Sequence, residues 1–289
     1  MKYFSINDIE KFSGIKAATL RMWEKRYGIA NPARTEYNDR VYDVNLLETF
    51  LDIAILKNNG WKISVLSSMT KEALKQKIDS LTHRDDTYLA AINRLTICMF
   101  KTDIEEFEAI LDAVFKKYSV SSALLHIIIP FFEKVNMLSY TSSDNEMHIA
   151  VSLIRKKIIY EIERLKPETK NLGTALLFLP QDEHYDLMLL CMYYILKERG
   201  LKIIYLGTNI PEQNIISMLK NKKPEYIFTY LAEGNFLKFK KMILNIQEEL
   251  AEQKFGIVGD RKSVEMEAAN INAVNYIPYN QLSEMIQTA

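Results

Sequence analysis

The basic side chains near the N-terminus have the spacing of one helix face. Residues 17–27 place Leu20, Trp23 and Tyr27 at intervals of three and four, so these side chains share an inward face. The opposite arc carries the cations together with two apolar residues: Ala18, Arg21, Met22, Lys25 and Arg26. A helix fits the major groove of B-DNA, and arginine donates to base edges and phosphate oxygens. We therefore expect this helix to bind duplex DNA.

The residues that follow this helix read as a β-hairpin, or wing. A polar turn over residues 36–39 separates Arg34 from Arg40 and Tyr42. We expect these three side chains to contact the DNA backbone beside the groove. Any one of the cations alone is more simply a solvated surface residue, but their gathering on one supersecondary unit favours DNA binding.

The chain as a whole is electrically balanced, which limits its partners. Its 289 residues carry 37 basic and 37 acidic side chains, so binding to nucleic acid through bulk positive charge is excluded. Residues 1–42 nevertheless hold eight Lys or Arg against five Asp or Glu, a local positive excess. Hydrophobic residues make up 48% and charged residues 26%, which excludes a fully disordered chain.

Membrane spans and metal-binding cysteine motifs are not expected. The longest apolar run, residues 187–196, is about half the length of a membrane-spanning helix. The N-terminus has no signal-peptide pattern, so we expect a cytoplasmic protein. Cys98 and Cys191 lie in apolar surroundings and are expected to be buried thiols, without a Cys-x-x-Cys pair for zinc.

The pattern of elements predicts a multidomain protein with three modules. Residues 1–70 contain a capped helix between Ser5 and Gly14, the helix at 17–27, the hairpin, a helix at 44–58 and a short helix from Ile63. Two helices joined by a tight glycine-containing turn form a helix-turn-helix. The first module is therefore expected to be an all-α winged helix-turn-helix domain.

The second and third modules differ in their hydrophobic period. Residues 71–170 lack glycine and contain four apolar runs at helical spacing, which predict a four-helix bundle. Residues 171–289 alternate strand-like runs at 174–179, 202–206, 226–231, 255–258 and 274–277 with helices at 185–199, 212–220 and 235–251. This alternation predicts an α/β Rossmann-like parallel sheet. Ligands of such sheets bind beyond the carboxyl ends of the strands, here in loops 180–184, 207–211, 231–235 and 259–262.

The first module resembles the MerR family of bacterial transcriptional regulators. Three phrases carry the resemblance: Thr19-Leu20-Arg21-Met22-Trp23-Glu24-Lys25-Arg26-Tyr27-Gly28, then Asn31-Pro32-Ala33-Arg34, then Arg40-Val41-Tyr42. Lys16 and Asn38-Asp39 stand where the family often has a serine N-cap and a wing glycine. The resemblance implies dimeric binding to a palindromic promoter element through Thr19, Arg21, Lys25, Arg26, Arg34, Arg40 and Tyr42.

The remaining chain resembles the effector half of the cobalamin-dependent, light-responsive branch of that family. There a four-helix bundle precedes a Rossmann-like cobalamin-binding domain. The lower-axial motif Asp-x-His-x-x-Gly stands here as Asp182, His184 and Leu187. The Ser-x-Leu motif stands as Thr229 and Leu231, the Gly-Gly pair as Gly259 and Asp260, and the cap motif Trp-x₉-Glu-His as Met137, Met147 and His148.

This second resemblance implies cobalamin as the cofactor. His184 would be the cobalt ligand, with Asp182 orienting its imidazole. Leu187 and Asp260 replace glycines that leave room for the cofactor's nucleotide tail. Met137 and Met147 form either an apolar lid or ordinary bundle core, and His148 is either an upper-face ligand or a polar residue near a helix start.

Two classes of function compete for this layout. One is a DNA-binding regulator whose C-terminal half binds cobalamin, binds another ligand or serves as an oligomerisation scaffold. The other is a corrinoid carrier or enzyme module. The helix-turn-helix favours the regulator, and no set of catalytic side chains indicates an enzyme. Expected partners are promoter DNA, further copies of the chain and RNA polymerase, and no membrane. Because no heptad repeat continues after Val44, association is expected through the second and third modules.

Overall fold

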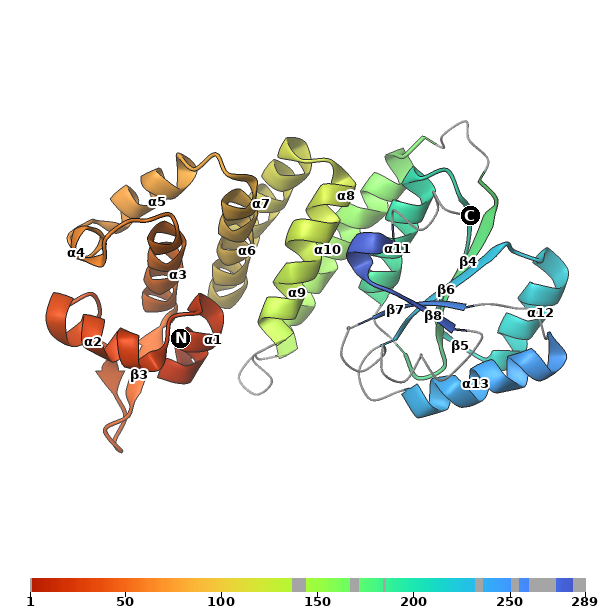
Figure 1. Cartoon of the computed structure of the whole chain (residues 1–289), viewed down its shortest axis with the longest axis horizontal. Helices are drawn as coiled ribbons and strands as arrows, with labels where there is room; N and C mark the ends of the chain where they lie inside the picture. The colour runs from red at the N-terminus through yellow and green to blue at the C-terminus, as the bar shows by residue number, and fades with distance from the viewer. Residues whose placement is uncertain are drawn as a thin grey trace. The chain divides into compact units, whose positions relative to one another are not determined.

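The computed structural model describes residues 2–136, 144–166, 172–183, 186–231, 236–250, 255–259 and 274–282 (Figure 1). The chain forms two compact units, Met1–Leu153 and Ile154–Ala289. The boundary lies inside helix α10 (Asp144–Arg164), and the division into three modules at residues 70 and 170 stays a prediction. Among the described residues, no helix combines the length and hydropathy of a membrane span.

The first unit opens with the elements predicted for the DNA-binding module. In chain order they are β1 (Tyr3–Phe4), α1 (Ile6–Ser13), α2 (Ala17–Tyr27), β2 (Ala33–Arg34), β3 (Arg40–Asp43), α3 (Val44–Asn58) and α4 (Ile63–Leu66). The strands pair antiparallel in the order β1-β3-β2. Strand β1 was not predicted, because two residues carry no periodicity and their partner lies far along the chain.

Local sequence signals set the ends of the flanking helices. The Ser5 hydroxyl accepts from the Asp8 N–H, and the Asp8 carboxylate accepts from the Ser5 N–H, which forms a capping box for α1. Gly14 ends α1 with a φ of 71°, a left-handed conformation that glycine adopts without steric cost. The Asp43 carboxylate caps α3 by accepting from the Leu46 N–H at 2.8 Å.

Further helical segments complete the first unit, and the last of them continues into the second. They are α5 (Lys71–Asp79), α6 (Arg84–Lys101), α7 (Ile104–Lys117), α8 (Val120–Ala123), the π-helical turn η1 (Leu124–Ile128), α9 (Ile129–Asn136) and α10. The third run of the predicted bundle is therefore α8, η1 and α9 in succession. Pro130 accounts for the π-turn, since proline has no N–H and its ring crowds the carbonyl one turn earlier.

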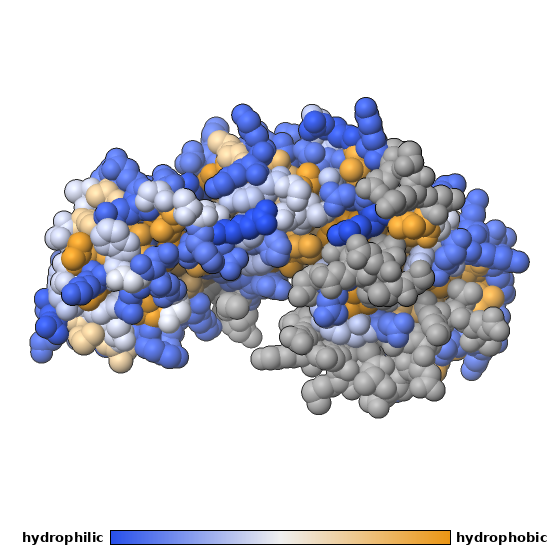
Figure 2. Space-filling model, turned by 45° about the horizontal axis from the view of Figure 1, so that its top comes forward, coloured by the Kyte–Doolittle hydropathy of each residue, from blue (hydrophilic) through white to orange (hydrophobic). Residues whose placement is uncertain are grey.

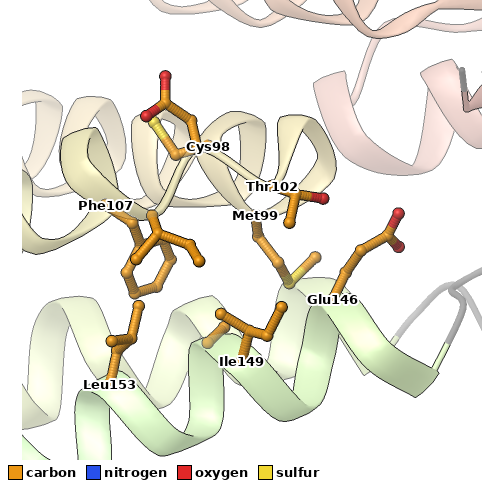
Figure 3. Close-up of a pocket in the computed structure, with 10 residues that line it drawn as sticks. Cys98, Met99, Thr102, Phe107, Glu146, Ile149 and Leu153 are labelled. Carbon is orange, nitrogen blue, oxygen red and sulfur yellow. The ribbon is translucent and has the colours of Figure 1, made fainter.

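Side chains of α6, α7 and α10 fill the space between these helices. Phe107 faces Leu153, and Met99 faces Ile149 (Figure 3). The cavity that remains there holds about 10 Å³, roughly the space of one water molecule. This region is packed core rather than a ligand pocket. On the face drawn in Figure 2, the hydrophobic residues of the first unit are separate spots among hydrophilic ones.

The second unit is a five-stranded parallel sheet with helices between the strands. Its elements are β4 (Thr174–Pro180), α11 (Asp186–Glu198), β5 (Lys202–Ile210), α12 (Glu212–Lys222), β6 (Tyr226–Leu231), α13 (Phe236–Glu249), β7 (Phe255–Gly259), β8 (Val274–Ile277) and the 3₁₀ turn η2 (Tyr279–Gln281). The strand order is β5-β4-β6-β7-β8. The order reverses between β4 and β6, the place where open α/β sheets bind ligands.

Strand β5 is longer than its sequence predicts. It continues through Ile210, so the predicted loop at 207–211 is wrong for all but its last residue. Gly207 and Asn209 have φ values of 86° and 56°, and the pairing of β5 with β4 shifts register beyond Tyr205. These turn-forming residues are accommodated as irregularities within the strand.

The inner strand β4 is buried almost throughout, which explains its continuous apolar run, whereas the edge strand β5 is partly exposed. Helices α12 and α13 cover one face through a core that includes Phe178, Ile216, Phe239 and Ile257. Gly256 lies where neighbouring strands meet closely, because a Cβ there would lie 2.5 Å from a Phe228 ring carbon. The parallel sheet thus has little spare volume in its interior.

Candidate functional site

Helix α2 exposes the cations that the sequence places on its outer face. The side chains of Arg21, Lys25 and Arg26 are exposed, whereas Leu20 and Trp23 are buried. The Arg26 guanidinium lies 5.4 Å from the ring centre of the neighbouring tyrosine, within cation–π range. Thr19 is partly buried on the flank of the helix. The outer face of α2 is therefore open to a polyanionic partner.

The N-terminus of α2 is capped from α1. Lys16 occupies the N-cap position and makes no side-chain cap. The Glu10 carboxylate instead accepts from the Ala17 N–H at 2.9 Å and pairs with the Lys16 ammonium at 2.9 Å. The backbone hydrogen bond and the ammonium lower the pKa of Glu10. A residue of α1 thus replaces the missing serine N-cap, which the sequence pattern of α2 alone does not reveal.

The hairpin of β2 and β3 holds its turn with its own side chains. Asn38 has a φ of 66°, a conformation that asparagine tolerates better than most residues, in place of the glycine common in the family. Arg34 donates to the backbone and side-chain oxygens of Asn38, both at 3.0 Å. The Thr35 hydroxyl accepts from the Asp39 N–H at 3.1 Å. Arg34 is exposed, but its guanidinium already has partners within the hairpin.

Glu24 joins the hairpin to α2. Its carboxylate pairs with the Arg40 guanidinium, Nε to Oε2 at 2.8 Å, and accepts a hydrogen bond from the Tyr42 hydroxyl. Only 9% of the Glu24 side chain is exposed. The sequence reasoning did not identify Glu24 as a functional residue. Its negative charge among the neighbouring basic residues was the feature that could have indicated its role.

Tyr42 is a correction to the predicted interface. Its side chain is fully buried against Phe50, so it cannot contact DNA. Burial and the hydrogen bond to Glu24 raise the pKa of the Tyr42 hydroxyl, which keeps it a neutral donor. Tyr42 fixes Glu24 from the inside of the domain instead.

The residues predicted for the cofactor divide into four groups, three of which are described first. His184, Met137 and Asp260 lie outside the described residues. Leu231 and Gly259 end strands β6 and β7 and are paired with each other. Met147 is partly buried and His148 exposed on α10.

The remaining predicted positions have other partners or are filled. Asp182, with a φ of 73°, pairs through Oδ2 with the Lys238 ammonium at 3.0 Å. The fully buried Thr229 hydroxyl donates to the Phe178 carbonyl at 2.8 Å. The Leu187 side chain is buried in the first turns of α11. The side chains at these motif positions, on or after the inner strands β4 and β6, therefore contact other residues of the protein.

A cavity of about 260 Å³ opens beside the same loop, at the carboxyl ends of β4 and β5. Its lining combines apolar side chains with the charged residues Asp182, Glu183, Glu212 and Lys238. His184, whose imidazole the sequence predicts as the cobalt ligand, follows Glu183 directly but lies outside the described residues, so its relation to this cavity stays a prediction. The cavity lies beyond the carboxyl ends of two strands, next to the point between β4 and β6 where the strand order reverses.

Comparison with known proteins identifies the N-terminal part. Residues 4–73 match the model of the MerR HTH family regulatory proteins. This segment is a MerR-family helix-turn-helix domain.

Two curated relatives extend the likeness beyond the MerR-family domain. The HTH-type transcriptional repressor CarA of Myxococcus xanthus is 23% identical over 224 residues, covering 77% of this chain and 74% of the relative. The repressor CarH of the same organism is 22% identical over 245 residues, covering 78% and 77%. Both relatives are named as transcriptional repressors.

A solved structure shares the fold of more than half of the chain. The monomethylamine corrinoid protein of Methanosarcina barkeri matches with a TM-score of 0.56 and 12% identity, covering 69% of this chain and 99% of that one. At this identity the likeness concerns the fold alone.

Proposed function

We propose that this protein is a sequence-specific DNA-binding transcriptional regulator with a ligand-binding C-terminal half. The observation that carries the proposal is the exposed face of α2, with Arg21, Lys25 and Arg26, inside a MerR-family domain. Helix α2 would enter the major groove, and the β2–β3 hairpin would act as the wing of a winged helix-turn-helix.

The contacts within the domain explain how the two DNA-binding elements keep a fixed angle. Glu24 holds Arg40 of the hairpin to α2 and is itself anchored by the buried Tyr42 hydroxyl. Arg40 keeps 31% of its side chain exposed and would reach a phosphate beside the groove. Glu24 and Tyr42 are positioning residues in this proposal.

We propose a dimer or higher oligomer as the DNA-binding form. One helix-turn-helix buries too little surface for specific recognition, and two copies that read two half-sites are the usual solution. The names of the two relatives support repression, which is achieved most simply when the bound protein excludes RNA polymerase from the promoter.

We propose cobalamin as the ligand of the second unit, with α6, α7, α8–α9 and α10 as the four-helix bundle of the effector half. The fold that the chain shares with the monomethylamine corrinoid protein supports this assignment. When bound, a corrinoid would supply a cobalt centre. His184 would hold the cobalt, and Asp182 would orient the imidazole once released from Lys238.

Two measurements test these assignments separately. The full chain is selected against random duplex DNA, and binding to the enriched site is titrated by fluorescence anisotropy at several KCl concentrations. Saturable binding that weakens steeply with salt supports the regulator. A chain that enriches no sequence contradicts it and favours the corrinoid-carrier alternative.

The cofactor is tested by mixing the chain with hydroxocobalamin or adenosylcobalamin, desalting and recording the absorption spectrum. We expect retained corrinoid with a histidine-ligated spectrum that His184→Ala loses. His83→Ala is a matched control, because that imidazole is exposed at the start of α6. If the wild-type chain retains no corrinoid, the cofactor assignment falls and the DNA-binding assignment stands.

A further inference from the structure

The outer face of α2 contains two apolar residues among its cations. Met22 is 49% exposed, and Ala18 is exposed as well. They lie four residues apart and are neighbours on the helix surface. A single exposed apolar side chain is ordinary on a protein surface. This pair, however, lies on the face that the proposed function places in the major groove.

The geometry of α2 puts this pair at the centre of that face. Successive residues of an α-helix are rotated by roughly 100°. The buried Leu20 and Trp23 define the inward direction, and Ala18 and Met22 lie on the opposite side. Arg21 and Lys25 flank the pair on one side and Arg26 on the other. Long helical side chains lean toward the N-terminus, so the methionine extends toward Ala18.

The chemistry of this pair limits what it can recognise. Alanine has no side-chain donor or acceptor, and the methionine thioether is only a weak acceptor. Neither side chain can read the hydrogen-bonding edges of guanine, cytosine or adenine. The one apolar group that a base pair presents in the major groove is the C5-methyl group of thymine.

We infer that Ala18 and Met22 form an apolar contact that reads thymine methyl groups, and that Met22 determines sequence specificity. This inference rests on the proposed function of α2 as the DNA-reading helix. The flanking cations supply affinity through phosphates and guanine, whereas the pair discriminates thymine from cytosine. Removing a methyl group from such a contact lowers an equilibrium constant about fourfold.

The experiment replaces thymine by uracil, one position at a time, in the duplex that the full chain selects. Uracil keeps every hydrogen-bonding group of thymine and lacks only the methyl group. We expect one or two positions in each half-site at which the substitution weakens wild-type binding about threefold to fivefold, with an unchanged dependence on salt.

Variants of Met22 assign the effect to this side chain. Met22→Gln keeps the length and the helix propensity but ends in a polar amide, so we expect equal affinities for the thymine and uracil duplexes. Met22→Leu should keep the difference. Leu244→Ala, which shortens a similarly exposed apolar side chain on α13, is the matched control and should keep both affinity and discrimination. Circular dichroism confirms that each variant is folded.

The outcomes separate this inference from the proposed function. If the wild-type chain selects no DNA sequence, the proposed function fails and the inference falls with it. If the chain binds a selected site but no uracil substitution weakens binding, the regulator stands and the thymine contact is overturned. Discrimination that survives unchanged in Met22→Gln also overturns the assignment to Met22.

Discussion

The two candidate sites of this protein present their polar residues in opposite ways. On α2 the cations Arg21, Lys25 and Arg26 extend into solvent. At the edge of the parallel sheet, Asp182 is paired with Lys238 and the Thr229 hydroxyl with the Phe178 carbonyl. A DNA-binding surface makes its contacts with side chains that project into solvent. A small-molecule site instead needs an open cavity, and one or two larger side chains are enough to fill it.

The largest expected effect is the loss of DNA binding when two arginines are removed. In Arg21→Ala/Arg40→Ala we expect affinity for the selected duplex to fall about 100-fold or more, because each arginine that binds DNA is worth about 1–3 kcal/mol. The salt dependence should flatten by about one unit for each phosphate that no longer binds an arginine. Anisotropy titrations measure both quantities.

The control for this pair is Arg164→Ala, which removes an arginine that is 62% exposed at the end of α10. It should leave affinity unchanged. Retained binding by the double variant would show that α2 and the hairpin are not the DNA interface, and the contrast between the two sites would disappear.

A second prediction concerns the space at the sheet edge. Leu187→Ala removes a buried side chain where related motifs have glycine, so we expect it to raise the amount of hydroxocobalamin retained after desalting. The same change should lower the free energy of unfolding by about 2–4 kcal/mol, because it leaves a cavity. Absorption spectra and urea denaturation provide the readouts. A variant that retains less corrinoid than the wild type would show that this leucine does not obstruct the site.

Glu24 offers a finer test of the DNA-binding side. Glu24→Ala leaves the buried Tyr42 hydroxyl without its acceptor, at a cost of about 1–3 kcal/mol in unfolding free energy. DNA affinity should also fall several-fold, since Arg40 loses its anchor to α2. In the Tyr42→Phe background the same change should cost less stability, because no hydroxyl remains to be satisfied. Equal costs in both backgrounds would contradict the coupling.

The smallest expected effect is a dependence on pH in α3. Burial raises the pKa of Asp52 to about 7, with a further contribution from the nearby Glu48 and Asp79 and opposing ones from Lys75 and Arg94. A folded-state pKa above the unfolded one means that the folded chain binds more protons between about pH 4 and pH 7. Stability should therefore decrease as the pH rises through this interval.

Asp52→Asn tests this assignment, because asparagine does not ionise. We expect it to be more stable than the wild type at pH 8 and equally stable at pH 4, because only the wild type must ionise a carboxyl group whose folded-state pKa is raised. Urea denaturation at a series of pH values measures the difference. Parallel curves for the two proteins would show that Asp52 does not titrate in this range.

The regular elements of both units could be predicted from periodicity. Helices α2 and α3 and strands β6 and β8 have the bounds expected from the sequence. The helical period and the buried-strand runs are local properties, so one sequence is enough to read them. Strand β1 and the extension of β5 through Ile210 were not predicted, because both depend on pairing with distant strands.

The candidate sites were less predictable than the elements that hold them. The exposed cations of α2 followed from the helix period, but the burial of Tyr42 did not. That burial depends on Phe50 and Glu24, which lie on two other elements. Lys238, which pairs with Asp182, lies on α13, far along the chain, and belongs to no motif. Partners from distant elements decide whether a motif residue is available.

The cap that Glu10 supplies to α2 has a consequence for the order of folding. An 11-residue helix is marginal by itself in water, and the first backbone N–H of this one finds its acceptor on another helix. Helix α2 therefore gains stability when α1 has formed and docked beside it. We expect the formation of the DNA-reading surface to be coupled to the folding of α1, so that a chain in which α1 is unfolded presents this surface less often.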